Sequence, residues 1–360
     1  MDVVVTLAGP DDDAGIRGLV RREALPGRVR LALPREPNFS LGCAVTGDDY
    51  RIVVARTFDD DAIVGVACRS VRNVFLNGRP QRIVYLGQLR IDERFRGRWL
   101  VSRGFSLLAG IDREQPAPLY LASIVDGNTA AIGVLVTRRR RGFPAFREVA
   151  RYHTLALPTR RSKPLLPGRE DIEAGTVDQL GDISEFLRLE GARRQFSSVW
   201  TEDALRELDS FGLRVGDIRV ARLNGQVVGV IALWDQTAYK QAIVRGYSGW
   251  LRAVAPLMRL PRIGQEIRSA YASLLCVRDD NAVLFERLLR EVYGLAHSRG
   301  FDYVLVGLDA RDPLLRTARA YPHFSYRSRF YLGPRPAASS GDRLYEQLDD
   351  RPAYIDIATL

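Results

Sequence analysis

The chain has 360 residues, of which 46% are hydrophobic and 27% are charged. This balance excludes a mostly disordered chain, and the length favours two domains of about 100–200 residues each. No apolar run approaches the roughly 18 residues that a membrane-spanning helix needs, and the first residues lack the basic and apolar regions of a signal peptide. We therefore expect a cytoplasmic protein that does not contact a membrane.

The formal net charge of +10 favours an anionic partner, such as a phosphorylated cofactor, an acidic substrate or nucleic acid. The charge alone does not choose among these. Cys43, Cys68 and Cys276 have no CxxC spacing, and the three histidines form no HxxxH pair. We therefore expect neither a disulfide framework nor a metal site.

In chain order, the sequence up to Leu157 predicts strands alternating with helices. Aspartates at 11–13 provide a helix N-cap before an apolar stripe, and Asn77-Gly78 is typical of a hairpin turn. The expected strands are Val3–Leu7, Arg51–Arg56, Ala62–Val71, Arg82–Ile91, Leu119–Val125 and Glu148–Leu157. One helix is expected directly after residue 13, and two more are expected at Leu100–Ile111 and Asn128–Val136.

The same order of elements recurs about 180 residues further on, after a proline-rich and basic stretch at 158–167. A second Asn-Gly turn lies at 224–225. The expected strands are one near Ile172, then Ile218–Arg222, Gln226–Leu233, Ala270–Val277, Tyr303–Leu308, Tyr326–Leu332 and a final Ala353–Ala358. The expected helices are Val177–Leu189, Asn281–Ser298 and Pro313–Ala320. We therefore predict two copies of one plan, at 1–157 and 169–333, joined by a linker at 158–168 and followed by a spacer and strand at 334–360.

The segment Leu86–Leu108 carries the clearest chemical signal, because a strand runs through an Arg-Gly turn into a helix. Free backbone N–H groups and the dipole at a helix N-terminus bind phosphate, and a glycine at 97 lets the backbone approach a pyrophosphate closely. An ordinary strand-to-helix turn with solvated arginines is the alternative interpretation.

This segment and the elements around it resemble the GNAT superfamily of N-acetyltransferases, whose cofactor motif is [Gln/Arg]-x-x-Gly-x-[Gly/Ala]. Arg94 and Gly97 match that motif, while Trp99 stands where a second small residue is expected. The resemblance implies a layered α/β (α+β) fold of two GNAT-like domains, each a mixed, mostly antiparallel sheet flanked by helices.

The resemblance also implies where acetyl-CoA, or another acyl-CoA, binds. The pantetheine arm would pair with the main chain of Leu89, Arg90 and Ile91, and Asn128 would contact it. The pyrophosphate would lie on backbone amides of the turn, namely those of Arg96, Gly97, Arg98, Trp99, Leu100 and Val101. The second half has Asp279 and Asp280 at the matching place, and these would repel a pyrophosphate. We therefore predict that only the first half binds the cofactor.

The candidate catalytic residues are Glu93, beside the motif, and Tyr152, on the predicted closing strand. Arginines around Glu93 favour its ionised form, so a solvated turn carboxylate is the alternative, and Tyr152 could instead belong to the core. The family's frequent general acid, a tyrosine seven residues after the helix-start Asn, is Leu135 here. The basic run Arg138–Arg141 could meet the 3′-phosphate of CoA or be a solvated helix end.

The sequence thus predicts an N-acetyltransferase that moves an acetyl group to a primary amine of a small molecule or peptide. Two alternatives stay open. One is an aminoacyl-tRNA-dependent transferase, which the basic charge fits, although no aromatic and basic RNA-binding motif supports nucleic-acid binding. The other is a non-catalytic protein that binds acyl-CoA or a protein partner, which Trp99 and Leu135 favour.

Overall fold

A computed structural model of the chain describes residues 2–24, 27, 29–47, 49–97, 99–114, 117–137, 143–249, 252–253, 260–335 and 344–360. The strands are β1 (Val3–Leu7), β2 (Val29–Ala32), β3 (Asp49–Thr57), β4 (Ile63–Leu76), β5 (Arg79–Ile91), β6 (Leu119–Val125), β7 (Arg147–Pro158), β8 (Asp171–Ala174), β9 (Ile218–Leu223), β10 (Gln226–Asp235), β11 (Ile243–Tyr247), β12 (Ser269–Val277), β13 (Tyr303–Asp309) and β14 (Phe324–Pro334). The α-helices are α1 (Asp13–Arg22), α2 (Phe39–Ala44), α3 (Leu100–Glu114), α4 (Thr129–Ile132), α5 (Leu180–Gly191), α6 (Glu202–Glu207), α8 (Ala282–Ser298) and α9 (Leu315–Arg319).

Nearly every element predicted from the sequence is present, with ends that differ by a few residues. The two Asn-Gly pairs form the tight turns of the β4–β5 and β9–β10 hairpins, and all four residues have a positive φ. The predicted helix at 128–136 consists of α4 followed by a π-helical turn, Gly133–Thr137.

The predicted final strand at 353–358 is wrong. Ala353 makes one isolated bridge with Gln195, and a 3-10 helix follows at Ile357–Thr359. The carboxylate of Asp356 accepts a hydrogen bond from the backbone N–H of Ala358 at 3.0 Å. Such a side-chain bond to the backbone caps a helical turn and competes with a strand ladder. The sequence patterns also missed four short elements, namely β2, α2, α6 and β11.

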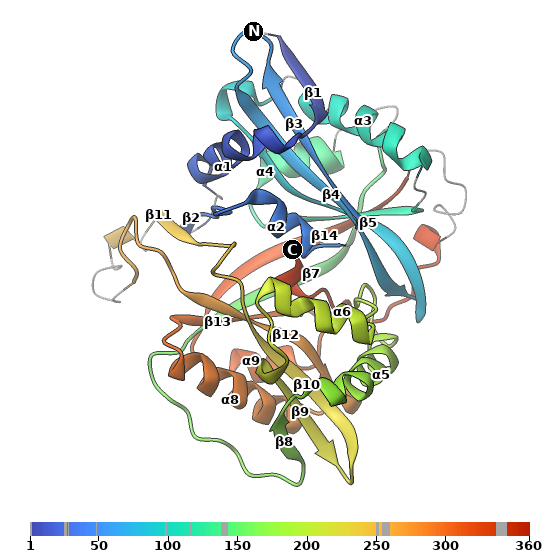
Figure 1. Cartoon of the computed structure of the whole chain (residues 1–360), viewed down its shortest axis with the longest axis vertical. Coiled ribbons are helices and arrows are strands. Elements are labelled where there is room, and N and C mark those ends of the chain that lie inside the picture. The colour runs from blue at the N-terminus through green and yellow to red at the C-terminus, as the bar shows by residue number, and fades with distance from the viewer. Residues whose placement is uncertain are drawn as a thin grey trace.

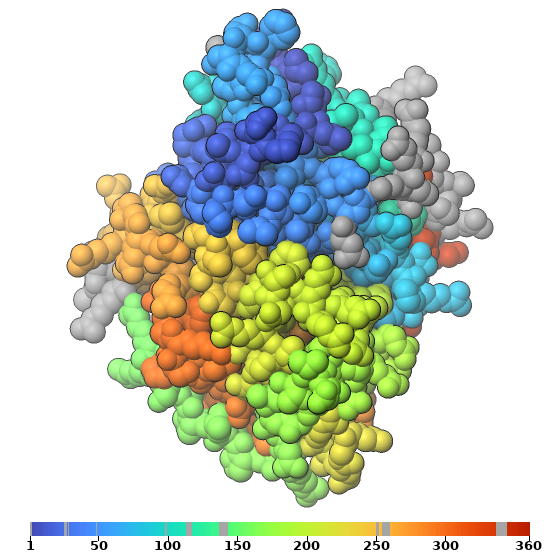
Figure 2. Space-filling model, in the orientation of Figure 1, coloured from blue at the N-terminus to red at the C-terminus, as the bar shows by residue number. Residues whose placement is uncertain are grey.

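The sheet is continuous through both halves (Figure 1) and its strand order is β1-β3-β4-β5-β6-β14-β7-β13-β12-β10-β9-β8. Neighbours are antiparallel except for the pairs β5–β6 and β12–β13. In the first half α1 and α2 pack on one face, and α3 and α4 on the other. In the second half α5 and α6 pack on the face opposite α8 and α9. The predicted mixed, mostly antiparallel sheet flanked by helices is therefore present, but the two halves share one long sheet where we expected a sheet in each. The space-filling view shows the two halves packed directly against each other (Figure 2).

The last strand of each half lies beside the other half. β14 is inserted between β6 and β7 of the first half, with register pairs that run from Ser328↔Val125 to Pro334↔Leu119 on one side. β7 in turn pairs with β13 of the second half. Residues 159–170 contain no strand or helix and connect the two halves along the chain. The halves are also joined by the backbone hydrogen bonds of the shared sheet. The domain boundaries stay a prediction.

Among the helices that the structure describes, none is both long and apolar enough to cross a membrane.

Candidate functional site

The sheet opens between β5 and β6. These parallel strands pair only from Val84↔Tyr120 to Leu86↔Ala122, although β5 continues along β4 as far as Ile91. Two residues after the last pair, Gln88 has a φ of 57°, in the left-handed region that non-glycine residues rarely adopt. The register between β4 and β5 shifts at the same place. This bulge turns β5 away from β6 and leaves a gap in the sheet.

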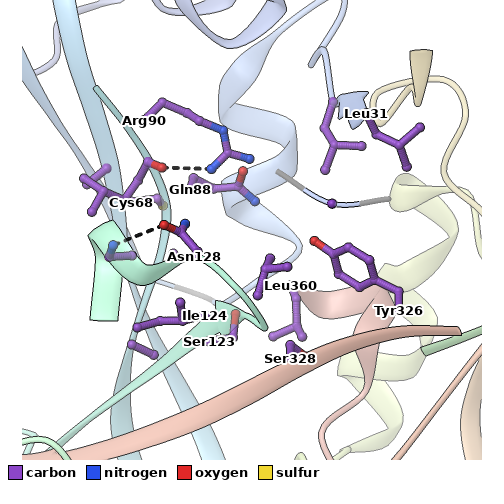
Figure 3. A pocket seen from close by; sticks show the side chains of 18 of the residues that line it. Leu31, Cys68, Gln88, Arg90, Ser123, Ile124, Asn128, Tyr326, Ser328 and Leu360 are labelled. Atoms are coloured by element: carbon purple, nitrogen blue, oxygen red, sulfur yellow. Dashed lines mark hydrogen bonds between the residues drawn. The ribbon is translucent and has the colours of Figure 1, made fainter. Parts of the chain in front are cut away.

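A cavity of about 900 Å³ lies in this gap (Figure 3). Its volume is near the upper end of the range of about 300–1,000 Å³ for ligand pockets. First-half residues in its wall include Gln88, Leu89, Arg90, Ile91, Leu100, Val101, Gly104, Phe105, Asn128 and Leu135. Second-half residues in its wall include Lys240, Tyr271, Tyr303, Leu305, Tyr326 and Leu360. The cavity therefore has walls from both halves and room for more than one small reactant.

The cavity wall includes Leu100 and Val101, which begin α3 and directly follow the Arg-Gly turn. Gly97 has a φ of 83°, and a Cβ at this position would meet no atom within 4 Å. Trp99 also has a positive φ, and its side chain is 65% exposed, so it lies at the surface. The Arg96 guanidinium bonds to the Glu23 carboxylate at 2.6 Å. Arg98 and the run Arg138–Arg141 lie outside the described residues. The turn thus offers backbone amides at the first turn of a 15-residue helix.

Asn128 is the N-cap of α4, and its side-chain oxygen accepts a hydrogen bond from the Ala131 N–H at 3.1 Å (Figure 3). This N-cap holds Asn128 in the cavity wall. Leu135, in the π-helical turn, is part of the same wall. The position where the resemblance leads us to expect a tyrosine therefore presents an apolar side chain.

The two predicted catalytic residues lie outside this wall. Glu93 is exposed in the turn after β5. Tyr152 is 1% exposed in the core, where its hydroxyl accepts a bond from the N–H of Ile355, and burial raises the pKa of that hydroxyl well above its ordinary value. Their catalytic roles stay predictions, and the geometry brings neither side chain to the cavity.

The hydroxyl groups of Tyr326 and Ser123 are in the wall but could not be recognised from the sequence. The Tyr326 hydroxyl points into the cavity (Figure 3), and burial raises its pKa to about 12, so that it stays protonated near neutral pH. Tyr85 and Ser123 share a hydrogen bond of 2.7 Å at the base of the gap. Asp126 has the one side-chain carboxylate among the described wall residues, and it is bonded to Arg329 at 2.6 Å. Tyr326 was missed because β14 comes from the other half.

The second half has a matching gap between β12 and β13, and that gap is filled. These strands pair only as far as Ala272↔Val306, and two residues later Leu274 has a φ of 50°. The N–H of Leu274 donates to the Asp356 carboxylate at 2.9 Å, and the N–H of Leu275 donates to the Tyr354 hydroxyl at 2.9 Å. The segment at 352–360 thus occupies the space that is open in the first half.

This bilobal arrangement is the fold of the GCN5-related N-acetyltransferases (GNAT) and N-myristoyltransferases, so the predicted fold is confirmed. A GCN5-related N-acetyltransferase from Sphaerobacter thermophilus superimposes over 99% of this chain and 98% of its own, with a TM-score of 0.58 and 16% identity. N-myristoyltransferase of Saccharomyces cerevisiae with bound myristoyl-CoA covers 92% of this chain and 79% of its own, with a TM-score of 0.62 and 10% identity. A glucosamine N-acetyltransferase region of a fungal multi-domain β-N-acetylglucosaminidase gives a TM-score of 0.64 and 15% identity, over 92% of this chain and 38% of that one.

No protein-family profile matches the sequence, and no curated protein matches it significantly.

Proposed function

We propose that this protein is an acyl-CoA-dependent N-acyltransferase that binds its cofactor in the first half and transfers an acetyl group to a primary amine of a small molecule or peptide. One observation carries the proposal. Two equivalent gaps exist in the sheet, and the first half leaves its gap open as a cavity beside a glycine turn, while residues 352–360 fill the other. One cofactor site per chain follows.

Each part of the cofactor has a candidate partner in the first half. The main chain of Leu89–Ile91 borders the gap and can pair with the amide-rich pantetheine arm, as an added strand would. The amides of the turn from Arg96 to Val101 suit the pyrophosphate, because they lie at the N-terminus of α3. Asn128 is also in the cavity wall. When bound, the cofactor supplies a thioester carbon for attack by an amine.

An amine acceptor must lose its ammonium proton before it attacks. Among the side chains of the described wall there is one carboxylate, that of Asp126, and it is already paired with Arg329. Desolvation in the cavity and the nearby charges of Arg35 and Arg90 both disfavour an ammonium ion. We therefore propose that the cavity lowers the pKa of the bound amine, so that a water molecule suffices to take the proton.

Charge then develops on the thioester oxygen and on the leaving sulfur. Hydrogen-bond donors fixed in a low-dielectric site stabilise such charge. Tyr326 is our candidate donor, because its hydroxyl is protonated and points into the cavity. Replacement by phenylalanine removes the donor and keeps the ring.

The test measures binding and turnover separately. Calorimetry with CoA is expected to give one site per chain, and release of free thiol from acetyl-CoA is expected when a mixed pool of amines is added. A series of longer acyl-CoA donors in the same assay determines the acyl group. No CoA binding, or two equivalent sites per chain, would overturn the proposal.

A non-catalytic acyl-CoA-binding protein is the second candidate, because Leu135 puts an apolar side chain where we expect the family's general acid. One CoA site without any thiol release, with the full range of amines and donors, would favour this function over catalysis.

A further inference from the structure

Three arginines belong to the cavity wall in the described part of the chain and are at least partly buried, and their surroundings differ. Arg69 is bonded to the Asp112 carboxylate at 2.7 and 2.9 Å and lies 3.6 Å from that of Asp49. Arg35 and Arg90 form no ion pair with any described carboxylate. A buried charge without a counter-ion is costly, so these two side chains require an explanation.

Arg35 is 4% exposed and lies in the segment between β2 and α2. One of its terminal nitrogens donates to the carbonyl oxygens of Leu33 and Pro34, both at 3.1 Å. Its Nε is buried and has no hydrogen-bond partner among the described residues. The hydrogen-bond acceptors of this guanidinium among the described residues are therefore two neutral backbone carbonyls from adjacent residues.

Arg90 is in the same situation on β5 (Figure 3). One terminal nitrogen donates to the carbonyl oxygen of Leu89 at 2.8 Å, and its buried Nε has no partner among the described residues. Burial, together with the nearby charge of Arg35, lowers the pKa of Arg90 to about 10. Two guanidinium groups thus face one cavity closely enough to repel each other.

The carboxylate that follows Arg35 in the sequence and the one whose charge acts on Arg90 are already engaged. Glu36, next to Arg35, bonds to Arg17 and Arg21, and Glu23 bonds to Arg96. Lys240, another cation of the wall, donates to the backbone oxygen of Ala358 at 2.8 Å and to that of Leu360, the last residue of the given chain, at 2.9 Å. Arg327 is exposed to solvent. Arg35 and Arg90 are therefore the guanidinium groups of the described wall that are at least partly buried and have no counter-ion.

We infer that Arg35 and Arg90 together bind a carboxylate carried by one of the two reactants. A guanidinium holds a carboxylate through parallel, charge-assisted hydrogen bonds, and a bound carboxylate would give both unpartnered Nε groups an acceptor. This inference deepens the proposed function and rests on it, because it names the chemical class of a reactant.

The carboxylate has two possible sources. It is carried either by the amine acceptor, as in an amino acid, or by the acyl group, as in a dicarboxylic acyl-CoA. The position of Arg35 favours the acceptor. Arg35 follows β2, which pairs with β11 of the second half, and Figure 1 shows this pair across the view from α3, where we place the pyrophosphate.

The first experiment compares thermal unfolding of Arg35→Met, Arg90→Met and Arg69→Met without any ligand. Methionine keeps much of the buried volume and removes the charge. Replacement of an uncompensated charge by an apolar group of similar size is expected to leave the melting temperature unchanged or raise it, whereas loss of the paired Arg69 leaves Asp112 unbalanced and is expected to lower it clearly. A decrease in Arg35→Met and Arg90→Met as large as that in Arg69→Met would mean that both arginines are structural, and would overturn the inference.

The second experiment measures binding of three L-amino acids, phenylalanine, glutamate and lysine, each beside its α-amide. It also compares succinyl-CoA with acetyl-CoA. For at least one of these pairs, the wild-type protein is expected to bind the carboxylate form about tenfold more tightly, because charge-assisted hydrogen bonds contribute about 1.5–3 kcal/mol. Preference in the amino-acid arm identifies the acceptor as the source, and preference in the CoA arm identifies the donor.

Arg35→Met and Arg90→Met are expected to abolish that preference, and Arg35→Gln provides a second variant if Arg35→Met does not fold. Equal affinity for the acid and neutral forms in both arms, or an unchanged preference in the variants, would overturn the inference. Wild-type protein that binds no CoA but still selects carboxylates through these arginines would instead refute the proposed function and leave this site standing.

Discussion

Gly97 is the residue at which the cofactor assignment can be tested most directly, and Gly225 is its matched control. Both glycines have a left-handed φ, 83° and 80°, and neither would bring a Cβ within 4 Å of another atom. Neither glycine is itself in the cavity wall, but Gly97 lies three residues before the wall residue Leu100, whereas Gly225 lies in the β9–β10 hairpin turn of the second half. Glutamate at either position is expected to reduce the free energy of unfolding by a similar amount, roughly 1–2 kcal/mol, because the left-handed region strains any residue with a Cβ.

The effect on CoA binding is expected only in Gly97→Glu. A carboxylate about 5 Å from a phosphate repels each negative charge by about 1–3 kcal/mol, for effective dielectric constants of about 80 to 20. This repulsion corresponds to about 5- to 150-fold weaker binding. Calorimetry with CoA at about 0.1 M salt measures it, and the loss should shrink as salt screens the charges.

Gly97→Gln separates charge from bulk, because glutamine has nearly the shape of glutamate without its charge. If Gly97→Glu and Gly97→Gln bind CoA equally well, no phosphate lies on this turn. If Gly225→Glu weakens binding as much as Gly97→Glu, the loss comes from general destabilisation. Either result would refute the placement of the pyrophosphate.

Three further predictions concern the cavity, the linker and the turn. Gly104→Phe should place a bulky side chain in the cavity wall and weaken CoA binding, while Gly110→Phe on the exposed side of the same helix should not. Neither glycine has an atom within 4 Å of an added Cβ, and calorimetry distinguishes the two variants. Cutting the chain within 158–167 should leave a first half that has no turnover and binds CoA only when the second half is added back, because β14 must pair between β6 and β7. Size-exclusion chromatography and thiol release of the separate and the mixed halves measure this. The hydrogen bond from Arg94 lowers the pKa of Asp92 to about 2. The stabilisation by this bond is therefore complete above the unfolded-state pKa of about 4 and is lost as the pH falls from about 4 to 2. Melting curves of wild type and Asp92→Asn should differ by less than about 1 kcal/mol, because Arg94 is exposed, and should converge over that pH range.

Local signals in the sequence predicted most of the helices and strands. The Asn-Gly pairs, the apolar stripe of α8 and the turn at Gly97 are each encoded within a few neighbouring residues, which is why a single sequence reveals them. The exception among predicted elements was the segment at 353–358. Its apolar residues alternate as in a strand, but its hydrogen bonds go to side chains such as that of Asp356.

The composition of the site could not be read from local patterns. Tyr326 reaches the cavity because β14 is inserted into the first half, and Arg35 reaches it through the β2–β11 pairing, which joins segments more than 200 residues apart. Such pairings leave no periodic trace in one sequence. The prediction of Glu93 used only its adjacency to the motif, and adjacency does not determine on which side of a turn a side chain lies.

The insertion of β14 also constrains how the protein is made on the ribosome. When residues 1–157 have emerged, β6 and β7 have no strand between them, and the one that belongs there is completed only at residue 334. Unpaired strand edges of this kind recruit other chains, and slow pairing between distant segments prolongs that exposure. Nascent chains of this protein should therefore depend on chaperones until the last strand arrives, and a stop codon anywhere before β14 should lower the soluble yield unless the second half is supplied separately.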